Sequence, residues 1–145
     1  MRIDKLYLQN FRCYDELKLE FDKNMTVIVG ENGKGKTAIL DALAISLEPY
    51  LRALGCKGRN MGERDVRRIK DAGDESITRI LRMKSKYPVT IKVEGENAGE
   101  AMTWSRELKS ERGRTTSNNA KELADYGKVL YEDINSVGDE KIVLP

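Results

Sequence analysis

The stretch that decides the fold is residues 27 to 43, VIVGENGKGKTAILDAL. Its centre, from Gly30 to Thr37, fits the pattern G-x-x-x-x-G-K-[ST], with an apolar run before it and helix-forming residues after it. Glycines in such a loop let backbone N–H groups converge on phosphate oxygens, and the N-terminus of the following helix adds further N–H groups and the positive end of its dipole. The pattern therefore predicts a loop that binds the phosphates of a nucleotide.

Two side chains of the loop have distinct predicted roles. Lys36 is placed to reach the β- and γ-phosphates, while the hydroxyl of Thr37 is a hard oxygen ligand suited to Mg²⁺. The alternative is an accidental glycine-rich turn followed by Lys-Thr, and the flanking strand and helix patterns argue against it. The predicted nucleotide contacts are consecutive: Gly30, Glu31, Asn32, Gly33, Lys34, Gly35, Lys36, Thr37 and Ala38.

Apolar patterning places this loop in an α/β fold. Residues 2 to 22 predict an antiparallel hairpin, with a bulge where Ile3 falls out of phase with the other apolar residues. Residues 25 to 29, MTVIV, are nearly all apolar or β-branched, as in a central strand covered on both faces. After the loop we expect a helix that begins around residues 34 to 37, then a short helix from Pro49 to Leu54. The predicted inner stripe of the first helix is Ile39, Leu40, Leu43 and Leu47.

The second half of the chain predicts another hairpin and a long helix. Residues 89 to 93 alternate apolar and polar side chains, and residues 101 to 108 supply the antiparallel partner across the turn GENAG. Residues 120 to 134 hold apolar side chains at steps of three or four, which is typical of a helix with one packed face. Residues 141 to 144 have the pattern of a strand. The stretch 64 to 86 is compatible with a helical turn or a short strand, with Ile77, Ile80 and Leu81 as its apolar residues.

Composition excludes several classes of protein. The 145-residue chain has 39% hydrophobic and 34% charged residues, as in a globular protein, and no uncharged run approaches the ~18 residues of a membrane helix. There is no histidine, and the two cysteines, Cys13 and Cys56, form no C-x-x-C pair, so zinc sites and histidine-dependent nucleophiles are excluded. We expect a cytoplasmic protein with reduced thiols, in which Cys13 is a small packed residue and Trp104 belongs to the core.

The sequence lacks the residues that would complete phosphoryl transfer. That reaction needs a second metal-holding carboxylate, usually an Asp after about four apolar residues at a strand end, and a group that positions the attacking water. The stretches TIKVEGE and KIVLP do not provide such a strand end. No catalytic residue is assignable, and Lys36 is assigned only to stabilise phosphates.

Residues 1 to 47 resemble the opening of ABC-type ATPase heads of the RecF and SMC class, a type of P-loop NTPase. The shared features are an N-terminal hairpin with Leu8-x-Asn10-Phe11-Arg12, a strand, G-x-N-G-x-G-K-[ST], and a helix that carries Asp41-Ala42. The resemblance implies ATP and Mg²⁺ as cofactors and places Arg12 close to the nucleotide. It also implies a head-to-head homodimer that sandwiches two ATP molecules.

Residues 48 to 145 resemble, in shorter motifs, bacterial AAA family ATPases that include components of anti-phage defence systems. The matching stretches are Asp65-Val66-Arg67, Tyr87-Pro88-Val89, Trp104-Ser105-Arg106 and Val143-Leu144-Pro145. In that family another core strand, the Gln loop, the signature motif, the acidic strand and the switch histidine follow. The resemblance implies that this chain is the N-terminal lobe of a head and is inactive alone. The full-length form would hydrolyse ATP on head dimerisation, in DNA-related work or with a defence effector protein.

We divide this lobe into residues 1–54 with the first hairpin, the loop and its helix, a basic flexible segment at 55–86, and residues 87–145 with the second hairpin and an amphipathic helix. The stretch 52 to 86 is rich in Lys and Arg and could contact a DNA or RNA backbone, although a solvated loop is the plainer interpretation. The alternative function is therefore a nucleic-acid or protein interaction module that is independent of nucleotide. Arg67 or Arg68 could instead act across a head-to-head interface.

Overall fold

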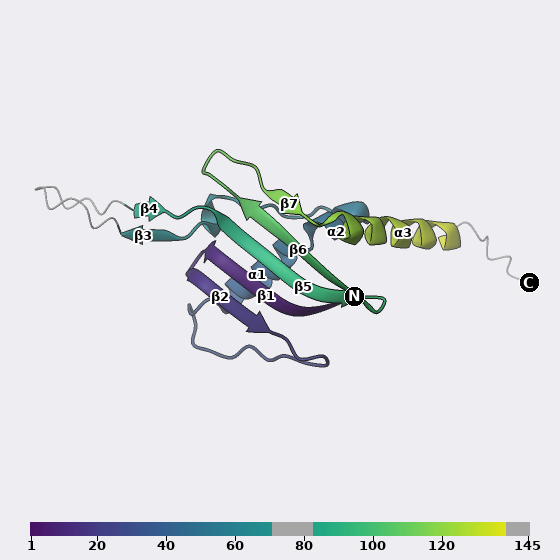
Figure 1. Cartoon of the computed structure of the whole chain (residues 1–145), viewed down its shortest axis with the longest axis horizontal. Helices are drawn as coiled ribbons and strands as arrows, with labels where there is room; N and C mark the ends of the chain where they lie inside the picture. The colour runs from purple at the N-terminus through teal and green to yellow at the C-terminus, as the bar shows by residue number, and fades with distance from the viewer. Residues whose placement is uncertain (71–82, 139–145) are drawn as a thin grey trace, which may run out of the picture.

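The computed structural model describes residues 1–70 and 83–138, which contain an antiparallel sheet with a helix against one face (Figure 1). The strands of this sheet are β1 (Arg2–Phe11), β2 (Tyr14–Glu20), β5 (Val89–Asn97), β6 (Glu100–Leu108) and β7 (Thr116–Asn118). Their order is β2-β1-β5-β6-β7. A separate two-stranded hairpin of β3 (Arg68–Lys70) and β4 (Met83–Ser85) follows the short 3-10 helix η1 (Glu63–Asp65).

The first predicted hairpin is confirmed. β1 and β2 pair in antiparallel register with Leu8 opposite Leu17, and β1 pairs along its other edge with β5. The β1–β5 register shifts between Ile3 and Lys5, where the sequence predicts a bulge. Leu6 and Leu8 are buried because alternate side chains of β1 face the core.

The second predicted hairpin is also confirmed, with a tighter turn than the sequence predicts. Gly95 to Asn97, expected in the turn, continue β5 and pair with the start of β6. Only Ala98 and Gly99 connect the strands, with φ of 52° and 88°. Two residues with positive φ give a turn whose twist matches that of the paired strands. The hairpin therefore extends farther from the core than expected.

Two helices follow the phosphate loop as predicted, α1 (Lys36–Ser46) and α2 (Glu48–Ala53). α1 contacts β1, β5 and β6. Leu40, predicted in its inner stripe, is 60% exposed, because the buried positions form a face on the other side of the helix. Leu43 and Leu47 are half-buried at the edge of that face. The buried residues of α1 are Ala38, Ile39, Ala42, Ile45 and Ser46.

Polar groups in the core are paired across elements. Trp104, predicted in the core, is 1% exposed, and its indole N–H donates to the Ser46 carbonyl oxygen at 2.9 Å. Arg106 of β6 is equally buried and makes an ion pair with Glu48 of α2. Its guanidinium also donates to the Asn60 side-chain oxygen. These contacts join the sheet, α2 and the loop after α2. The charge of Arg106 can be buried because it is paired.

The predicted long helix is α3 (Lys121–Gly138), and it packs against α2 instead of the sheet. The rings of Tyr50 and Tyr126 stack with centroids 5.9 Å apart. Gly127 permits this approach, because an added Cβ there would lie 2.8 Å from the Tyr50 carbonyl oxygen. Farther along the helix, Tyr131 and Ile134 are 47% and 66% exposed. Only the first half of the predicted apolar stripe is therefore covered.

The predicted central strand at residues 25 to 29 is wrong. In the described part of the chain these residues pair with no strand, and Val27 and Val29 are 65% and 87% exposed. A turn begins at Asp22, whose carboxylate accepts a hydrogen bond from the backbone N–H of Asn24 at 2.9 Å. β-branched residues favour a strand only where they pair with one, and β2, the edge strand directly before this segment, pairs only with β1 in the described sheet.

The basic segment is only partly described. Residues 56 to 62 have neither helix nor strand, as predicted, although Met61 is buried. The predicted turn or strand around Ile77, Ile80 and Leu81 and the predicted strand at residues 141 to 144 lie outside the described residues.

Candidate nucleotide-binding site

The phosphate loop leads directly into α1. Gly33 and Gly35 have φ of 82° and 92°, a left-handed conformation that favours glycine. α1 begins at Lys36, so the N–H groups of its first turn, which have no partner within the helix, lie at the end of the loop. Residues 30 to 34 are exposed. The loop and the helix N-terminus can therefore receive an anion from solvent.

Lys36 reaches back across the loop that precedes it. Its ammonium donates hydrogen bonds to the carbonyl oxygens of Gly30 at 2.5 Å and Glu31 at 2.7 Å. Thr37 is exposed, so its hydroxyl is accessible to a metal ion, whereas Ala38 is buried and can offer a ligand only its backbone. A positive charge and an accessible hydroxyl thus lie next to the unpartnered N–H groups of the first turn of α1.

The turn between β1 and β2 lies against the loop. The Tyr14 hydroxyl donates to the Lys34 carbonyl oxygen at 3.4 Å. An added Cβ at Gly35 would approach the Tyr14 hydroxyl oxygen to 2.5 Å and the Cys13 sulfur to 2.6 Å. Burial raises the pKa of Tyr14, with a smaller contribution from Cys13. Gly35 is therefore required both by its φ and by the close approach of this turn.

Cys13 itself is exposed, so the prediction of a packed cysteine is wrong. The residue belongs to the short turn between β1 and β2, and turns lie at the surface. Its sulfur nevertheless lies close to Gly35 of the phosphate loop.

Arg12 belongs to an ion-pair network beside α1. Arg12 and Asn10 both have a left-handed backbone, with φ of 51° and 52°. The Arg12 guanidinium lies 2.5 Å from the carboxylate of Asp41 on α1 and 2.9 Å from that of Asp65 in η1. Arg59 contacts the same carboxylates, at 3.5 Å for Asp41 and 2.9 Å for Asp65. Strained backbone held by surrounding contacts is common at functional sites.

This network fixes the charge and position of Arg12. Asp65 is 1% exposed and also accepts the N–H of Gly62 at 3.0 Å. Burial works to lower the pKa of Arg12, but hydrogen bonds to Asp65 and Asp41 raise it above its ordinary value. The structure thus brings residues 30 to 38 together as one loop and helix start, and places Arg12 beside α1 with its polar contacts to carboxylates. Arg59 and Asp65 were not predicted in this network, because their contacts have no local sequence period.

A family model described as an AAA domain (AAA_23) matches residues 5–145. The chain belongs to this family. Among curated relatives of this AAA domain, the DNA replication and repair protein RecF of Streptococcus suis is 35% identical over 92 residues, covering 63% of this chain and 23% of that protein. The DNA double-strand break repair Rad50 ATPase of Thermococcus kodakarensis is 33% identical over 89 residues, covering 61% of this chain and 10% of that protein. The chain therefore spans only a minor part of the length of these relatives.

Solved ATPase heads share the fold of this AAA domain. A structure described as "Structural biochemistry of ATP-driven dimerization and DNA stimulated activation of SMC ATPases" matches 99% of this chain and 94% of its own chain, with a TM-score of 0.58 at 19% identity. The SMC head domain from Thermotoga maritima matches 87% of this chain and 41% of its own, with a TM-score of 0.52 at 27% identity. The predicted α/β P-loop NTPase fold of the RecF and SMC class is confirmed.

In this AAA domain, four of the five described arginines of the basic stretch, all except Arg64, form ion pairs with carboxylates of the same chain. Besides Arg59, these are Arg52 with Glu48 at 3.7 Å, Arg67 with Asp15 at 3.4 Å, and Arg68 with Glu63. Such pairing reduces the charge that the stretch can offer to a nucleic-acid backbone. The suggested action of Arg67 or Arg68 across a head interface stays a prediction.

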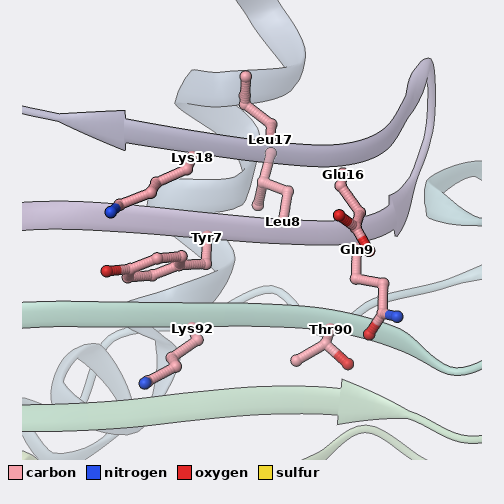
Figure 2. A pocket seen from close by; sticks show the side chains of 8 residues that line it. All are labelled: Tyr7, Leu8, Gln9, Glu16, Leu17, Lys18, Thr90 and Lys92. Atoms are coloured by element: carbon pink, nitrogen blue, oxygen red, sulfur yellow. The ribbon is translucent and has the colours of Figure 1, made fainter.

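An open hollow of about 530 Å³ lies on the outer face of β2, β1 and β5 (Figure 2). The ammonium groups of Lys18 and Lys92 lie 5.6 Å and 5.3 Å from the centre of the Tyr7 ring. The same lysines pair with Glu20 at 3.6 Å and Glu94 at 3.5 Å, which balances their charge. The hollow is separate from the phosphate loop, as its lining residues are Tyr7, Leu8, Gln9, Glu16, Leu17, Lys18, Thr90 and Lys92.

Within residues 1–70 and 83–138, no group of three or more His, Cys, Asp or Glu side chains could hold a metal ion. In this described part of the AAA domain, no helix has the length and apolar character needed to cross a membrane.

Proposed function

We propose that residues 30 to 38 bind ATP together with Mg²⁺. The observation that carries this proposal is the geometry of the loop: left-handed Gly33 and Gly35, a helix that begins at Lys36, and the Lys36 ammonium against the loop carbonyls. These features fit a phosphate group, which needs converging N–H groups and a nearby cation. Membership of the AAA domain family and a relative named as an ATPase support ATP as the nucleotide.

Each part of the loop would hold a different part of the nucleotide. The N–H groups of residues 33 to 38 would donate to phosphate oxygens. Lys36 would exchange its bonds to the Gly30 and Glu31 carbonyls for bonds to the β- and γ-phosphates. The Thr37 hydroxyl would be the protein ligand of Mg²⁺, which neutralises phosphate charge when it is bound.

The surrounding residues support binding more than turnover. Arg12, which the family resemblance places close to the nucleotide, would be held beside α1 by its ion pairs with Asp41 and Asp65. The carboxylates of Asp41 and Asp65 are both engaged by Arg12 and Arg59, so neither is free to activate a water molecule. We therefore propose that this chain alone does not hydrolyse ATP. Because the chain spans only a minor part of the length of its relatives, we also propose that it binds ATP weakly or undetectably by itself.

For the full-length protein we propose ATP hydrolysis by two heads that dimerise around two ATP molecules. The likeness to an SMC ATPase described by its ATP-driven dimerization supports this proposal at the level of fold. We place DNA-related work first, because the relatives are named for DNA replication and repair. Anti-phage defence with an effector protein, implied by the resemblance of residues 48 to 145, comes second. Either role would be in the cytoplasm.

Thermal unfolding with and without ATP and Mg²⁺ tests nucleotide binding by the full-length protein. ATP at about 100 times its Kd should stabilise the fold by about 2.7 kcal/mol, which raises Tm by several degrees. Lys36→Ala should abolish the shift and leave the ligand-free Tm nearly unchanged, because this side chain bonds only to carbonyls of an exposed loop. Lys18→Ala, on the outer face of the sheet, is the matched control and should keep the shift. An undiminished shift in Lys36→Ala would contradict the proposal.

Phosphate release measures turnover by the 145-residue chain. We expect none above background, because no water-positioning group is assignable. Hydrolysis that disappears in Lys36→Ala would show that this chain is a complete enzyme, and would overturn that part of the proposal.

A further inference from the structure

We propose that Tyr14 and Arg67 are positioning residues for the phosphate loop. They hold the β1–β2 turn against Gly35 and so maintain the conformation in which the loop meets a phosphate group. The inference rests on the proposed nucleotide site, and it assigns to Arg67 a role within its own chain.

Tyr14 occupies the space beside Gly35 where any other residue would carry its side chain. An added Cβ at Gly35 would lie 2.5 Å from the Tyr14 hydroxyl oxygen and 2.8 Å from the ring carbon that bears it. The hydroxyl also donates to the Lys34 carbonyl oxygen, but 3.4 Å is long for such a bond. Contact between the ring and the backbone of Gly35 is therefore the main restraint, and the hydroxyl adds a weaker one.

Arg67 fixes the residues on either side of Tyr14. Its guanidinium donates to the Cys13 carbonyl oxygen at 2.5 Å, and its Nε lies 3.4 Å from the carboxylate of Asp15. The guanidinium thus meets the turn on both sides of Tyr14, by a hydrogen bond to Cys13 and by an ion pair with the exposed carboxylate of Asp15.

The backbone of Arg67 is itself anchored to the sheet and to the small hairpin. Its N–H donates to the Asn10 carbonyl oxygen at 2.9 Å, and its carbonyl oxygen accepts the Lys86 N–H at 2.8 Å. The neighbouring Val66 is buried and forms an isolated bridge with Phe11 at the end of β1. Because its backbone is fixed in this way, the Arg67 side chain holds the β1–β2 turn in a defined position relative to β1 and β4.

Apart from the Tyr14 contacts, the hydrogen bonds of loop residues 30 to 34 in the described structure are local ones, from the Lys34 N–H to the Glu31 carbonyl oxygen and from the Lys36 ammonium to the Gly30 and Glu31 carbonyl oxygens. Residues 25 to 29 form no strand in the described structure, and residues 30 to 34 are exposed. α1 begins at Lys36, and Tyr14 meets the loop directly before it, at Lys34 and Gly35. A loop free to adopt several conformations is competent to bind for only a fraction of the time, and its apparent affinity falls by that fraction.

Proteolysis of the ligand-free protein tests the positioning role without ATP. Endoproteinase Lys-C cleavage after Lys34, followed by mass spectrometry, should become about fivefold faster in Tyr14→Ala and about threefold faster in Arg67→Ala, because cleavage follows local opening. The double variant should be cleaved no faster than Tyr14→Ala, since both residues act through one contact. Tyr14→Phe, which keeps the ring, should stay within about twofold of wild type. Tyr7→Ala, on the outer face, is the control and should not change the rate.

Unchanged cleavage in both Tyr14→Ala and Arg67→Ala would overturn the proposal. So would a double variant whose increase in cleavage rate equals the product of the two single increases. The ligand-free Tm is measured alongside, to distinguish loop opening from general unfolding. Should Tyr14→Ala fail to fold, Tyr14→Leu takes its place, because it keeps apolar bulk but not the ring over Gly35. Faster cleavage in Tyr14→Leu at an unchanged Tm supports the role, and a wild-type rate refutes it.

ATP titration of the full-length protein then separates this proposal from the function it rests on. Tyr14→Ala should weaken ATP about tenfold with little change in kcat at saturation, because positioning lowers the competent fraction without touching the chemistry. If Tyr14→Ala is cleaved faster but even the wild-type protein does not bind ATP, the proposed nucleotide binding is wrong and the proposed restraint of the loop by Tyr14 stands. ATP binding that is identical in wild type and Tyr14→Ala would remove the positioning role alone.

Discussion

Strand β5 and the segment at residues 25 to 29 are both rich in β-branched residues, yet one is buried and the other is exposed. Val89, Ile91 and Val93 are 0% exposed, and β5 is paired along both edges. Val27 and Val29, by contrast, are 65% and 87% exposed. Strand propensity measures how well side chains fit a paired and covered surface, so it is realised only where such a surface exists.

The two segments differ in the elements that come next in the chain. β5 leads through a two-residue turn into β6, so its partner is close in the chain and the pairing forms locally. Residues 25 to 29 lead into the phosphate loop and α1, and they do not pair with β2, the edge strand that precedes them. The comparison shows that composition alone does not decide whether a segment joins a sheet.

The largest expected difference between the two regions is in core packing. Ile91→Ala should lower the free energy of unfolding by about 3 kcal/mol, because it leaves a cavity between the sheet and α1. Val27→Ala should cost less than about 0.5 kcal/mol, because its side chain is already in water. Urea denaturation measures both. Equal losses would mean that residues 25 to 29 are buried in solution.

A second pair of variants applies one substitution to both regions. An added Cβ at Gly95 in β5 would overlap the Arg2 carbonyl oxygen, so Gly95→Ala should destabilise by about 2 kcal/mol through overpacking. Gly30 has no atom within 4 Å of such a Cβ, and Gly30→Ala should change stability by less than about 0.5 kcal/mol. Thermal unfolding measures the stability of both variants. A large loss of stability in Gly30→Ala would show that another part of the chain packs closely against Gly30.

Exposure of the unpaired segment can be measured with the dye ANS, which binds apolar surface. Replacing Val27 and Val29 together by Lys should reduce ANS fluorescence by about half, because this removes part of an exposed apolar patch. Thr103→Lys adds charge at an exposed polar position and should leave the signal unchanged. Fluorescence that persists in the double variant would assign dye binding to another surface.

The smallest effect concerns the acid titration of Asp22, in the turn just before residues 25 to 29. The pKa of Asp22 is lowered by hydrogen bonds from the backbone N–H groups of Asn24 and Met25. Because the folded pKa lies below the unfolded one, this contribution to stability is complete above about pH 4 and is lost as pH falls through the folded value. An NMR titration of the Asp22 carboxyl should give a midpoint below its ordinary value. A midpoint at or above it would show that the turn is not formed.

Much of the fold could be predicted because its signals are local. The two hairpins follow from period-two alternation, and α1, α2 and α3 follow from helical spacing and from Pro49. The errors arise where the outcome depends on distant neighbours. Leu40 has the right spacing but lies on the solvent side of α1, and α3 packs on α2, which no periodicity within α3 can indicate.

The candidate site likewise has a part that the sequence predicts and a part that it does not. The phosphate loop is a run of consecutive residues, so its glycines, Lys36 and Thr37 are recognisable in the sequence. The support around it comes from positions far apart in the chain. Tyr14, Arg59 and Arg67 reach the site only because the fold brings the β1–β2 turn, the loop after α2 and the start of β3 together.

The order of strands in the sheet also bears on how the chain is synthesised. β1 pairs with β2, which follows it directly in the chain, whereas its other edge pairs with β5, which begins at Val89. Closing the long loop between β1 and β5 costs more conformational entropy than forming the first hairpin. At a ribosomal rate of about 5–20 residues per second, the open edge of β1 is exposed for on the order of ten seconds. During that interval an unpaired apolar strand edge can recruit another nascent chain, which makes early chaperone binding advantageous.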